Sequence, residues 1–366
     1  MRLAWRNLIQ ERTRLALSVV GVALPILLIL LLQGFLGGMF RQIAAYLENS
    51  PGSLVVAQDG VVNLLGATSL LPPEAAAEAR QVKGIEAVVP ILSQFVILDL
   101  HDKKQPVYLI GYDPAIGGGP WQVAEGRGPN ADDEMVIDSV LADRHGLHLG
   151  DRFKIMDREF TIVGLSQGTT SWMTSFLFVR KTAAEALVRV PGATSFLLIS
   201  PAAGQDPETA RLRLESIPGT QALLKTEMIA NDSKLFGRLF SAPIRLMAGI
   251  AFLVGTLVVG LVIYTATIER RREYGVLKAI GAPNRVLFGV VTLQALAASV
   301  AGSLGGVALA VAAARAIMQL RPQFLIILEP TAAGGAIIAG VSMALLAALL
   351  PARIIGKLPP ADVFRR

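Results

Sequence analysis

Long apolar runs alternate with more polar stretches along this chain. Four runs, at 15–40, 243–268, 286–314 and 331–352, reach the roughly 20 apolar residues that cross a bilayer, and we expect each to be a transmembrane helix. A cleaved signal peptide is the alternative for the first run, because basic residues precede it. Its 26 uncharged residues exceed the roughly 7–15 of such a peptide and favour an uncleaved span.

The stretch 41–242 has the shorter periodicity of a folded domain. Helices are predicted at 72–84 and 207–219, which begin with proline, carry glutamate in the first turn and end on glycine. Segment 231–242 has one apolar helical face, and is either a helix on the domain core or a stalk that continues the second span outward. Strands are expected in SLVVAQ, VVPILSQFVILDL, PVYLIGYD, FKIMDREFTIVGL, SFLFVR and TSFLLIS. The sequence thus predicts a large α+β domain between the first two spans.

Small residues recur every fourth position in the last two spans. Such stripes let helix backbones approach closely, which supplies the van der Waals contact that drives helix association in lipid. We expect the third and fourth spans to pack tightly, and the bulkier first span to face lipid or a cavity. The stripes are Ala298, Gly302, Gly306, Ala310 and Ala314 in the third span, and Ala336, Gly340, Ala344 and Ala348 in the fourth.

Basic residues cluster at the ends of the apolar runs. The formal charge of +6 and the pI of 9.7 would suggest nucleic acid in a soluble protein, but the hydrophobic share of 53% and this clustering favour a membrane-topology signal and no nucleic-acid partner. The positive-inside rule places 1–14, 269–285 and 353–366 in the cytoplasm, so both termini are inside. The domain at 41–242 and a short link at 315–330 then lie outside.

Catalytic and nucleotide-binding motifs are missing from the sequence. It contains neither a GxxxxGK[ST] phosphate loop nor an HExxH zinc helix, and it has no cysteine. Ser342 lies in mid-span without a histidine base nearby in the sequence. His145 and His148 have the spacing of metal ligands, but a turn before a strand also explains them. We expect a chain that is not an enzyme and holds no metal.

Segment 269–285 begins with ERRREYGVLKAIGA, and the first five residues of this stretch are all charged. The arginines gain from an anionic leaflet, roughly 1 kcal/mol each, which explains a cytoplasmic loop. They do not explain the short apolar helix that follows, which Gly281 would cap and Pro283 would end. An apolar helix that projects from a membrane indicates a groove on a partner that receives it.

At these residues the chain resembles the MacB/FtsX-type permeases of ATP-binding-cassette (ABC) systems, closest to stand-alone permeases of the DevC, HrtB and lipoprotein-releasing kinds. Supporting similarities are AWRNLIQERTRLALSVVGVAL, which resembles the amphipathic helix before their first span, the domain segment LHLGDRFKIMDREFTIVGL, and the tail LPARIIGKLPPADVF. The chain departs from many relatives at Gln294, where they carry an acid, and at Tyr274. The matches to the ERRxEIGxLKAxGA-like signature are Glu269, Arg270, Arg271, Glu273, Gly275, Leu277, Lys278, Ala279, Gly281 and Ala282.

The resemblance implies a permease subunit that works with a separate ABC ATPase dimer, which binds the ATP and Mg²⁺. Segment 269–282, Tyr274 included, would be the coupling helix in the ATPase groove. The resemblance also implies a second permease copy, a bacterial inner membrane with its lipids and, in some systems, a periplasmic adaptor. Three functions stay open: mechanotransmission that exports or extracts a hydrophobic or amphiphilic substrate, FtsX-like signalling to an extracytoplasmic enzyme or sensor, and membrane catalysis, which the missing motifs disfavour.

Overall fold

A computed structural model describes residues 12–100, 103–171 and 174–356, and these divide into two compact units. A helical unit comprises the chain up to Gly38 and from Phe240 onward, and an outer unit comprises Met39–Leu239. Most of the predicted helix at 1–14 and of the tail at 353–366 lies outside the described residues.

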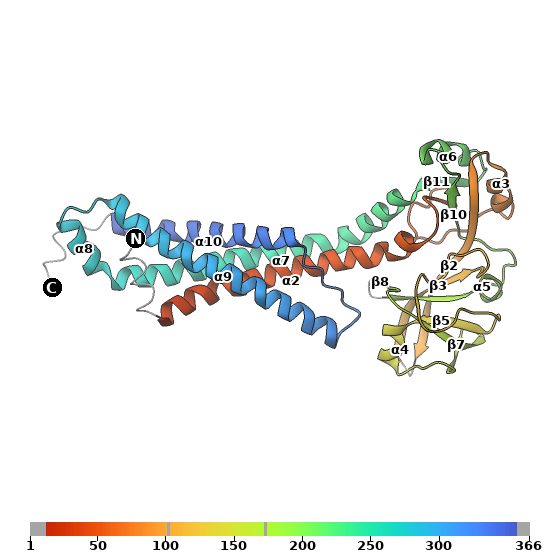
Figure 1. Cartoon of the computed structure of the whole chain (residues 1–366), viewed down its shortest axis with the longest axis horizontal. Helices are drawn as coiled ribbons and strands as arrows, with labels where there is room; N and C mark the ends of the chain where they lie inside the picture. The colour runs from red at the N-terminus through yellow and green to blue at the C-terminus, as the bar shows by residue number, and fades with distance from the viewer. Residues whose placement is uncertain (1–11, 101–102, 172–173, 357–366) are drawn as a thin grey trace. The chain divides into compact units, whose positions relative to one another are not determined.

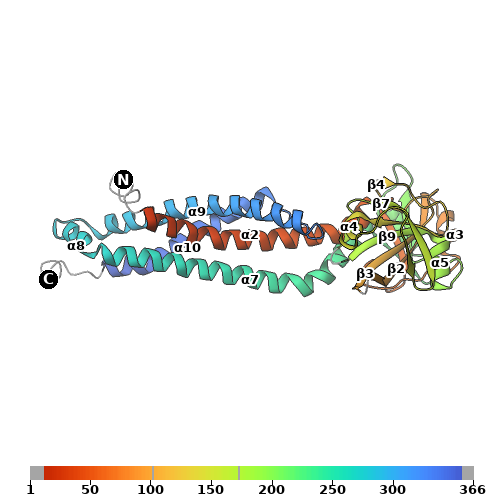
Figure 2. The same cartoon turned by 90° about the horizontal axis from the view of Figure 1, so that it is seen from below.

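Four long helices make up most of the helical unit, and each is long and apolar enough to cross a membrane. They are α2 (Arg12–Asn49), α7 (Lys225–Glu269), α9 (Asn284–Leu320) and α10 (Pro330–Gly356), and a short helix α8 (Arg271–Ala279) joins α7 to α9. The long helices run side by side in both views (Figures 1 and 2). Each extends beyond its predicted span, because helical hydrogen bonding continues past the apolar run where a folded neighbour or water takes over from lipid.

The small-residue stripes bring helices together, with one change from the expected pairing. Gly340 of α10 lies against Ser299 and Ser303 of α9, so the third and fourth spans are in contact as predicted. Gly302 and Gly306 of α9, however, face α2. A methyl group on Gly302 would come within 2.6 Å of Val22 Cβ, and one on Gly306 within 2.8 Å of Ala23 O and Ile26 Cβ. The first span is therefore packed into the bundle on this side, where its own backbone is approached closely.

Over its described residues, the outer unit is built on one mixed sheet of eleven strands, ordered β11-β1-β10-β2-β3-β9-β5-β7-β4, with β6 paired to β7 and β8 to β9. Most pairs are antiparallel, and β3–β9 and β5–β7 are parallel. Four short helices pack on the sheet: α3 (Ala75–Gln81), α4 (Ser139–His145), α5 (Lys181–Val188) and α6 (Pro207–Leu214). The strands are β1 Leu54–Gln58, β2 Ile85–Leu100, β3 Lys103–Tyr112, β4 Val123–Gly126, β5 Glu134–Asp138, β6 Arg152–Ile155, β7 Arg158–Ser166, β8 Thr170–Ser171, β9 Thr174–Arg180, β10 Phe196–Pro201 and β11 Thr220–Leu224.

Strand β2 joins two separate cores. Its first half pairs with β10 and its second half with β3, so one 16-residue strand belongs to two parts of the sheet. One core lies under α3 and α6, the other under α4 and α5. In the second half the burial alternates, with Val96 and Leu98 inside and Phe95 and Ile97 exposed, as a strand with one covered face requires.

The outer ends of α2 and α7 belong to the outer unit and are fixed within it. Tyr46 of α2 donates a hydrogen bond to Gly118 O (2.7 Å), and its ring lies 5.3 Å from that of Phe176. Asp232 of α7, 1% exposed, accepts from the backbone N–H groups of Leu64 and Leu65. Segment 231–242 is thus part of one helix with the second span, and its first turns also pack on the domain.

Two helices of the outer unit are shorter than predicted. The first begins at Ala75, after both prolines, and the second ends at Leu214, short of Gly219. In the second helix Asp206 caps the N-terminus by accepting from Thr209 N (3.0 Å). The segment FKIMDREFTIVGL, where strand structure was expected, contains β6 and β7, which form an antiparallel hairpin.

Candidate functional site

Helix α8 ends in a complete glycine cap. Gly281 N donates to Lys278 O (3.0 Å) and Ala282 N donates to Leu277 O (3.0 Å), the paired bonds of a Schellman motif. Gly281 has φ +99°, a conformation that side chains disfavour, so glycine is required here for a backbone reason. The chain then turns at Pro283 into α9.

One side of α8 is packed against the membrane helices. Tyr274 is 7% exposed and lies in a small apolar cluster with Leu287 and Val291 of α9, bordered by Ile263 of α7. Gly275 beside it is also buried. Both residues are among the predicted ATPase contacts, and in this structure they lie on the side of α8 that packs against α9.

The other side of α8 is open. Val276 and Leu277 are 43% and 40% exposed, and Ile280 is 79% exposed, so three apolar side chains are accessible on this short helix and its end. Ile280, absent from the matches to the family signature, is the most prominent apolar side chain here, and only its exposure reveals this. The remaining predicted contacts, Glu269, Arg271, Glu273, Ala279 and Gly281, are exposed around it, while Lys278 is half-buried and the Arg270 guanidinium lies 3.9 Å from Glu273.

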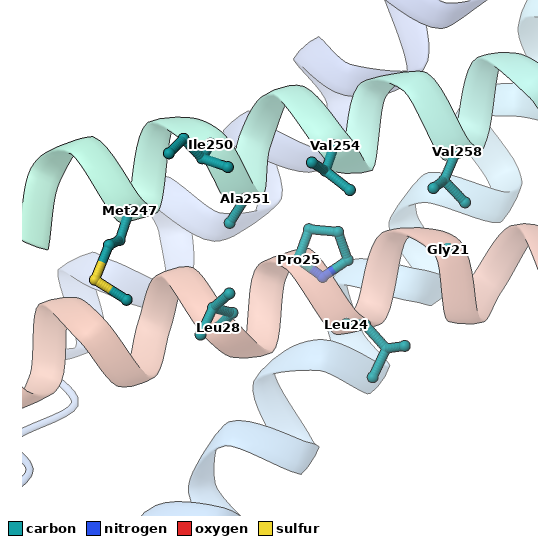
Figure 3. A pocket seen from close by; sticks show the side chains of 9 residues that line it. All are labelled: Gly21, Leu24, Pro25, Leu28, Met247, Ile250, Ala251, Val254 and Val258. Atoms are coloured by element: carbon teal, nitrogen blue, oxygen red, sulfur yellow. The ribbon is translucent and has the colours of Figure 1, made fainter.

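A wholly apolar groove separates α2 from α7 (Figure 3). The two helices approach closely at Pro25, which a methyl group on Gly255 would meet at 2.6 Å, and at Gly21, where Val258 is the neighbour. Beside these contacts a cavity of about 520 Å³ remains. Its lining residues are Gly21, Leu24, Pro25, Leu28, Met247, Ile250, Ala251, Val254 and Val258.

Helix α7 forms one wall of the groove and leads directly to α8. Three of the residues that line the groove, Ile250, Val254 and Val258, lie on the same unbroken helix that ends at Glu269, two residues before α8 begins. By the α-helical rise, Val254 is about 22 Å from the end of α7. One continuous helix thus connects the wall of the groove with the start of α8.

The other sequence candidates form no site. Ser342 donates its hydroxyl hydrogen to Ile338 O (2.8 Å), the ordinary bond of a serine within a helix. His145 ends α4, and His148 lies in the following turn with its ring nitrogen 3.7 Å from Asp151. Within the described ranges, no group of three or more His, Cys, Asp or Glu side chains is arranged to hold a metal ion.

Comparison with known proteins identifies two family domains. The MacB-like periplasmic core domain matches residues 15–217, and the FtsX-like permease C-terminal domain matches residues 245–360. An uncharacterized ABC transporter permease of Mycobacterium tuberculosis (strain ATCC 25618 / H37Rv) is 26% identical over 367 residues, 99% of this chain and 98% of the relative.

Two further relatives have more specific names. One, named as a candidate hemin transport system permease protein, HrtB, of Staphylococcus haemolyticus, is 22% identical and covers 82% of each chain. The other, the pyoverdine export ATP-binding/permease protein PvdT of Pseudomonas syringae pv. tomato, is 23% identical over 98% of this chain and 58% of its own length.

Among solved structures, the periplasmic region of MacB from Actinobacillus actinomycetemcomitans aligns with a TM-score of 0.38 at 12% identity, over 50% of this chain and 94% of that chain. The extracellular domain of the noncanonic ABC-type transporter YknZ aligns with a TM-score of 0.36 at 12% identity, over 47% and 98%.

Proposed function

Because this chain belongs to the MacB/FtsX-type family of ABC transporter permeases, we propose that it exports or extracts a hydrophobic or amphiphilic substrate through the α2–α7 groove. A partner ATPase would supply the ATP hydrolysis and bind ATP and Mg²⁺. The chain would lie in a bacterial inner membrane with both termini in the cytoplasm, and would act with a second permease copy and, in some assemblies, a periplasmic adaptor.

The apolar groove is the observation that carries this proposal. Glycine and apolar side chains alone line it, so the favourable interactions it offers are hydrophobic burial and dispersion rather than ion coordination. At about 520 Å³ it has the size of a site for a small organic molecule or an alkyl chain. A hemin transporter and a pyoverdine exporter among the named relatives are consistent with a substrate that is an organic molecule.

Helix α8 is the proposed contact for the ATPase. Its open side combines Val276, Leu277 and Ile280 with charged neighbours, and an amphipathic helix of this kind fits an apolar groove on a partner. Movement of α8 would be carried by α7 past the α2–α7 groove and on to Asp232 and the outer unit. This continuous helix supports mechanotransmission.

A second function, mechanical signalling without transport, is favoured by the anchoring of both helices in the outer unit. Tyr46 fixes the end of α2, and Lys225 of α7 donates to Ser50 O (2.8 Å), so motion of the spans would move the domain itself. In that case the groove would stay empty, and a partner outside the membrane would control ATP turnover.

A matched pair of substitutions tests the transport proposal in the purified permease–ATPase complex. Val254→Trp fills the groove, whereas Leu257→Trp adds the same side chain at a position 62% exposed and outside the lining. Small molecules that co-purify are extracted, identified by mass spectrometry and added back to measure stimulation of ATP turnover. We expect Val254→Trp to lose both the co-purifying molecule and the stimulation, and Leu257→Trp to keep them.

Equal behaviour of the two variants would remove the groove from the transport mechanism. An intact complex that yields no bound molecule, and whose turnover responds only to an extracytoplasmic partner protein, would replace transport with signalling.

A further inference from the structure

The link between α9 and α10 is an apolar strap that lies along α2. Residues 321–329, with the sequence RPQFLIILE, have no regular secondary structure, yet Ile326 is only 7% exposed. Leu328 packs against the apolar core of the helical unit. A solvated loop of nine residues would be expected to be polar, so this composition calls for a partner surface.

The partner surface is a glycine-rich face of α2. Ile327 N donates to Gly34 O (2.9 Å), and the rings of Phe35 and Phe324 lie 5.7 Å apart. A methyl group on Gly34 would come within 2.9 Å of Ile326 and Leu328 side-chain carbons, and one on Gly38 would overlap the carbonyl oxygen of Leu325. The GxxxG spacing that often joins two membrane helices is thus occupied by the chain's own strap.

The strap gives α2 a further point of attachment, apart from the crossing with α9. At that crossing, Gly302 and Gly306 of α9 receive α2 around Val22. From Val22 to Gly34 is about 18 Å along the helix. Each further point of attachment restricts the pivoting of a rod about one crossing. The strap therefore restricts the tilt of α2, and α2 forms one wall of the groove described above.

The strap is held in a way that permits release. In the α-helical pattern Gly34 O already accepts from residue 38, so the bond from Ile327 is an additional one. The other contacts named above join apolar residues of the strap to apolar side chains or to the glycine backbone of α2. Their separation leaves no buried charge without its partner, which is the costly outcome when a contact opens.

We infer that the strap, residues 321–329, acts as a releasable clip. It holds α2 in its resting tilt, and it leaves the Gly34–Gly38 face when ATP-driven motion changes the width of the α2–α7 groove. The seating of the clip is independent of any cargo. Its release rests on the proposed function, because the ATPase supplies the motion.

The test uses Ile326→Cys as a reporter in a chain that has no cysteine of its own. Membrane vesicles that hold the permease with its ATPase are treated with a membrane-impermeant maleimide, and the labelling rate is measured without nucleotide and in the vanadate-trapped state. Two background variants are compared. Gly38→Ala collides with the strap, whereas Gly37→Ala makes the same change where the nearest strap atom, Ile327 O, is 3.9 Å away.

We expect Gly38→Ala to raise the nucleotide-free labelling rate by at least about tenfold, which corresponds to about 1.4 kcal/mol in the seated population, and Gly37→Ala to leave it unchanged. In the parent and in Gly37→Ala, vanadate trapping should raise the rate towards that of Gly38→Ala. Equal rates for the two glycine variants would overturn the seating of the clip.

A labelling rate that does not change on vanadate trapping, in a complex that hydrolyses ATP, would overturn the proposed release of the clip. A complex that labels as expected in both states but whose ATP turnover ignores every co-purified molecule would count against transport and leave the clip standing.

Discussion

Gly281 offers the sharpest test of the coupling helix, because one backbone angle sets its conformation. At φ +99° an L-residue with a side chain pays roughly 1–2 kcal/mol, and a β-branched residue pays more. No neighbouring atom lies within 4 Å of a methyl group built at this position, so the cost is conformational and not a collision. Asparagine tolerates positive φ better than other non-glycine residues. Among substitutions of Gly281, we therefore expect Val to disrupt the helix cap most, Ala less and Asn least.

The magnitude of the expected effect on the helix end follows from the short length of α8. A nine-residue helix has little stability of its own, so a loss of about 1–2 kcal/mol lowers the population of its capped end about 5–30-fold. Ile280, next to the cap, would lose its position, and the ATPase would turn over without driving substrate movement. The assay is ATP turnover and substrate release from proteoliposomes, with membrane insertion checked in parallel.

The control is Gly289→Ala, a glycine inside α9 that also has no atom within 4 Å of an added methyl group. It should couple normally. Normal coupling in Gly281→Val, or equal damage from Asn and Val, would refute the backbone argument and reduce α8 to a membrane anchor.

Two further predictions concern packing and pH. Gly340→Ala should lower the thermal midpoint of the permease, because the added methyl group overlaps Ser303 Oγ and overpacking costs about 1–3 kcal/mol. Ser303→Ala, which leaves a Cβ at 3.4 Å, should restore the loss, while Gly334→Ala should have no effect; failure of the rescue would contradict this pairing of α9 with α10. In the outer unit, burial raises the pKa of Asp138 above its usual value, against the opposing effect of hydrogen bonds from Thr169, Thr170, Leu141 N and Ser175. The folded state therefore holds a proton at pH values where the unfolded state has lost it, so stability rises as the pH falls through the folded pKa and this gain is absent at higher pH. The midpoint of the parent should rise relative to Asp138→Asn as the pH falls from neutrality towards the usual aspartate pKa, and a constant difference would remove Asp138 as the cause.

Local patterns predicted the elements that carry their own signal. Four long apolar runs predicted the four membrane helices, and period-two segments predicted most of the strands, because burial of a helix in lipid or of one strand face leaves a regular trace. The cap at Gly281 was also predicted, since glycine followed by proline has a local cause. The roles assigned to the α8 residues and the orientation of the termini remain predictions.

Other features depend on which segments meet in space. A stripe of small residues says that something approaches, but the sequence does not say whether Gly302 meets α10 or α2, since both helices are apolar and either contact satisfies the pattern. For the same reason, the sequence did not show that Tyr274 lies on the packed side of α8, or that strand β2 contributes to two cores.

The sequence alone therefore determined the number of spans, the inserted α+β domain, the short capped helix after the second span and the family. Each depends on composition and spacing within a window of about 10–30 residues, where lipid, water or hydrogen bonding acts directly on the local chain. Only the tertiary structure decided that α2 lies against Gly302 and Gly306, that α2 and α7 leave a groove, and that residues 325–328 occupy the Gly34–Gly38 face. These features arise between segments hundreds of residues apart, where close packing of particular shapes, and not hydrophobicity, selects the partner.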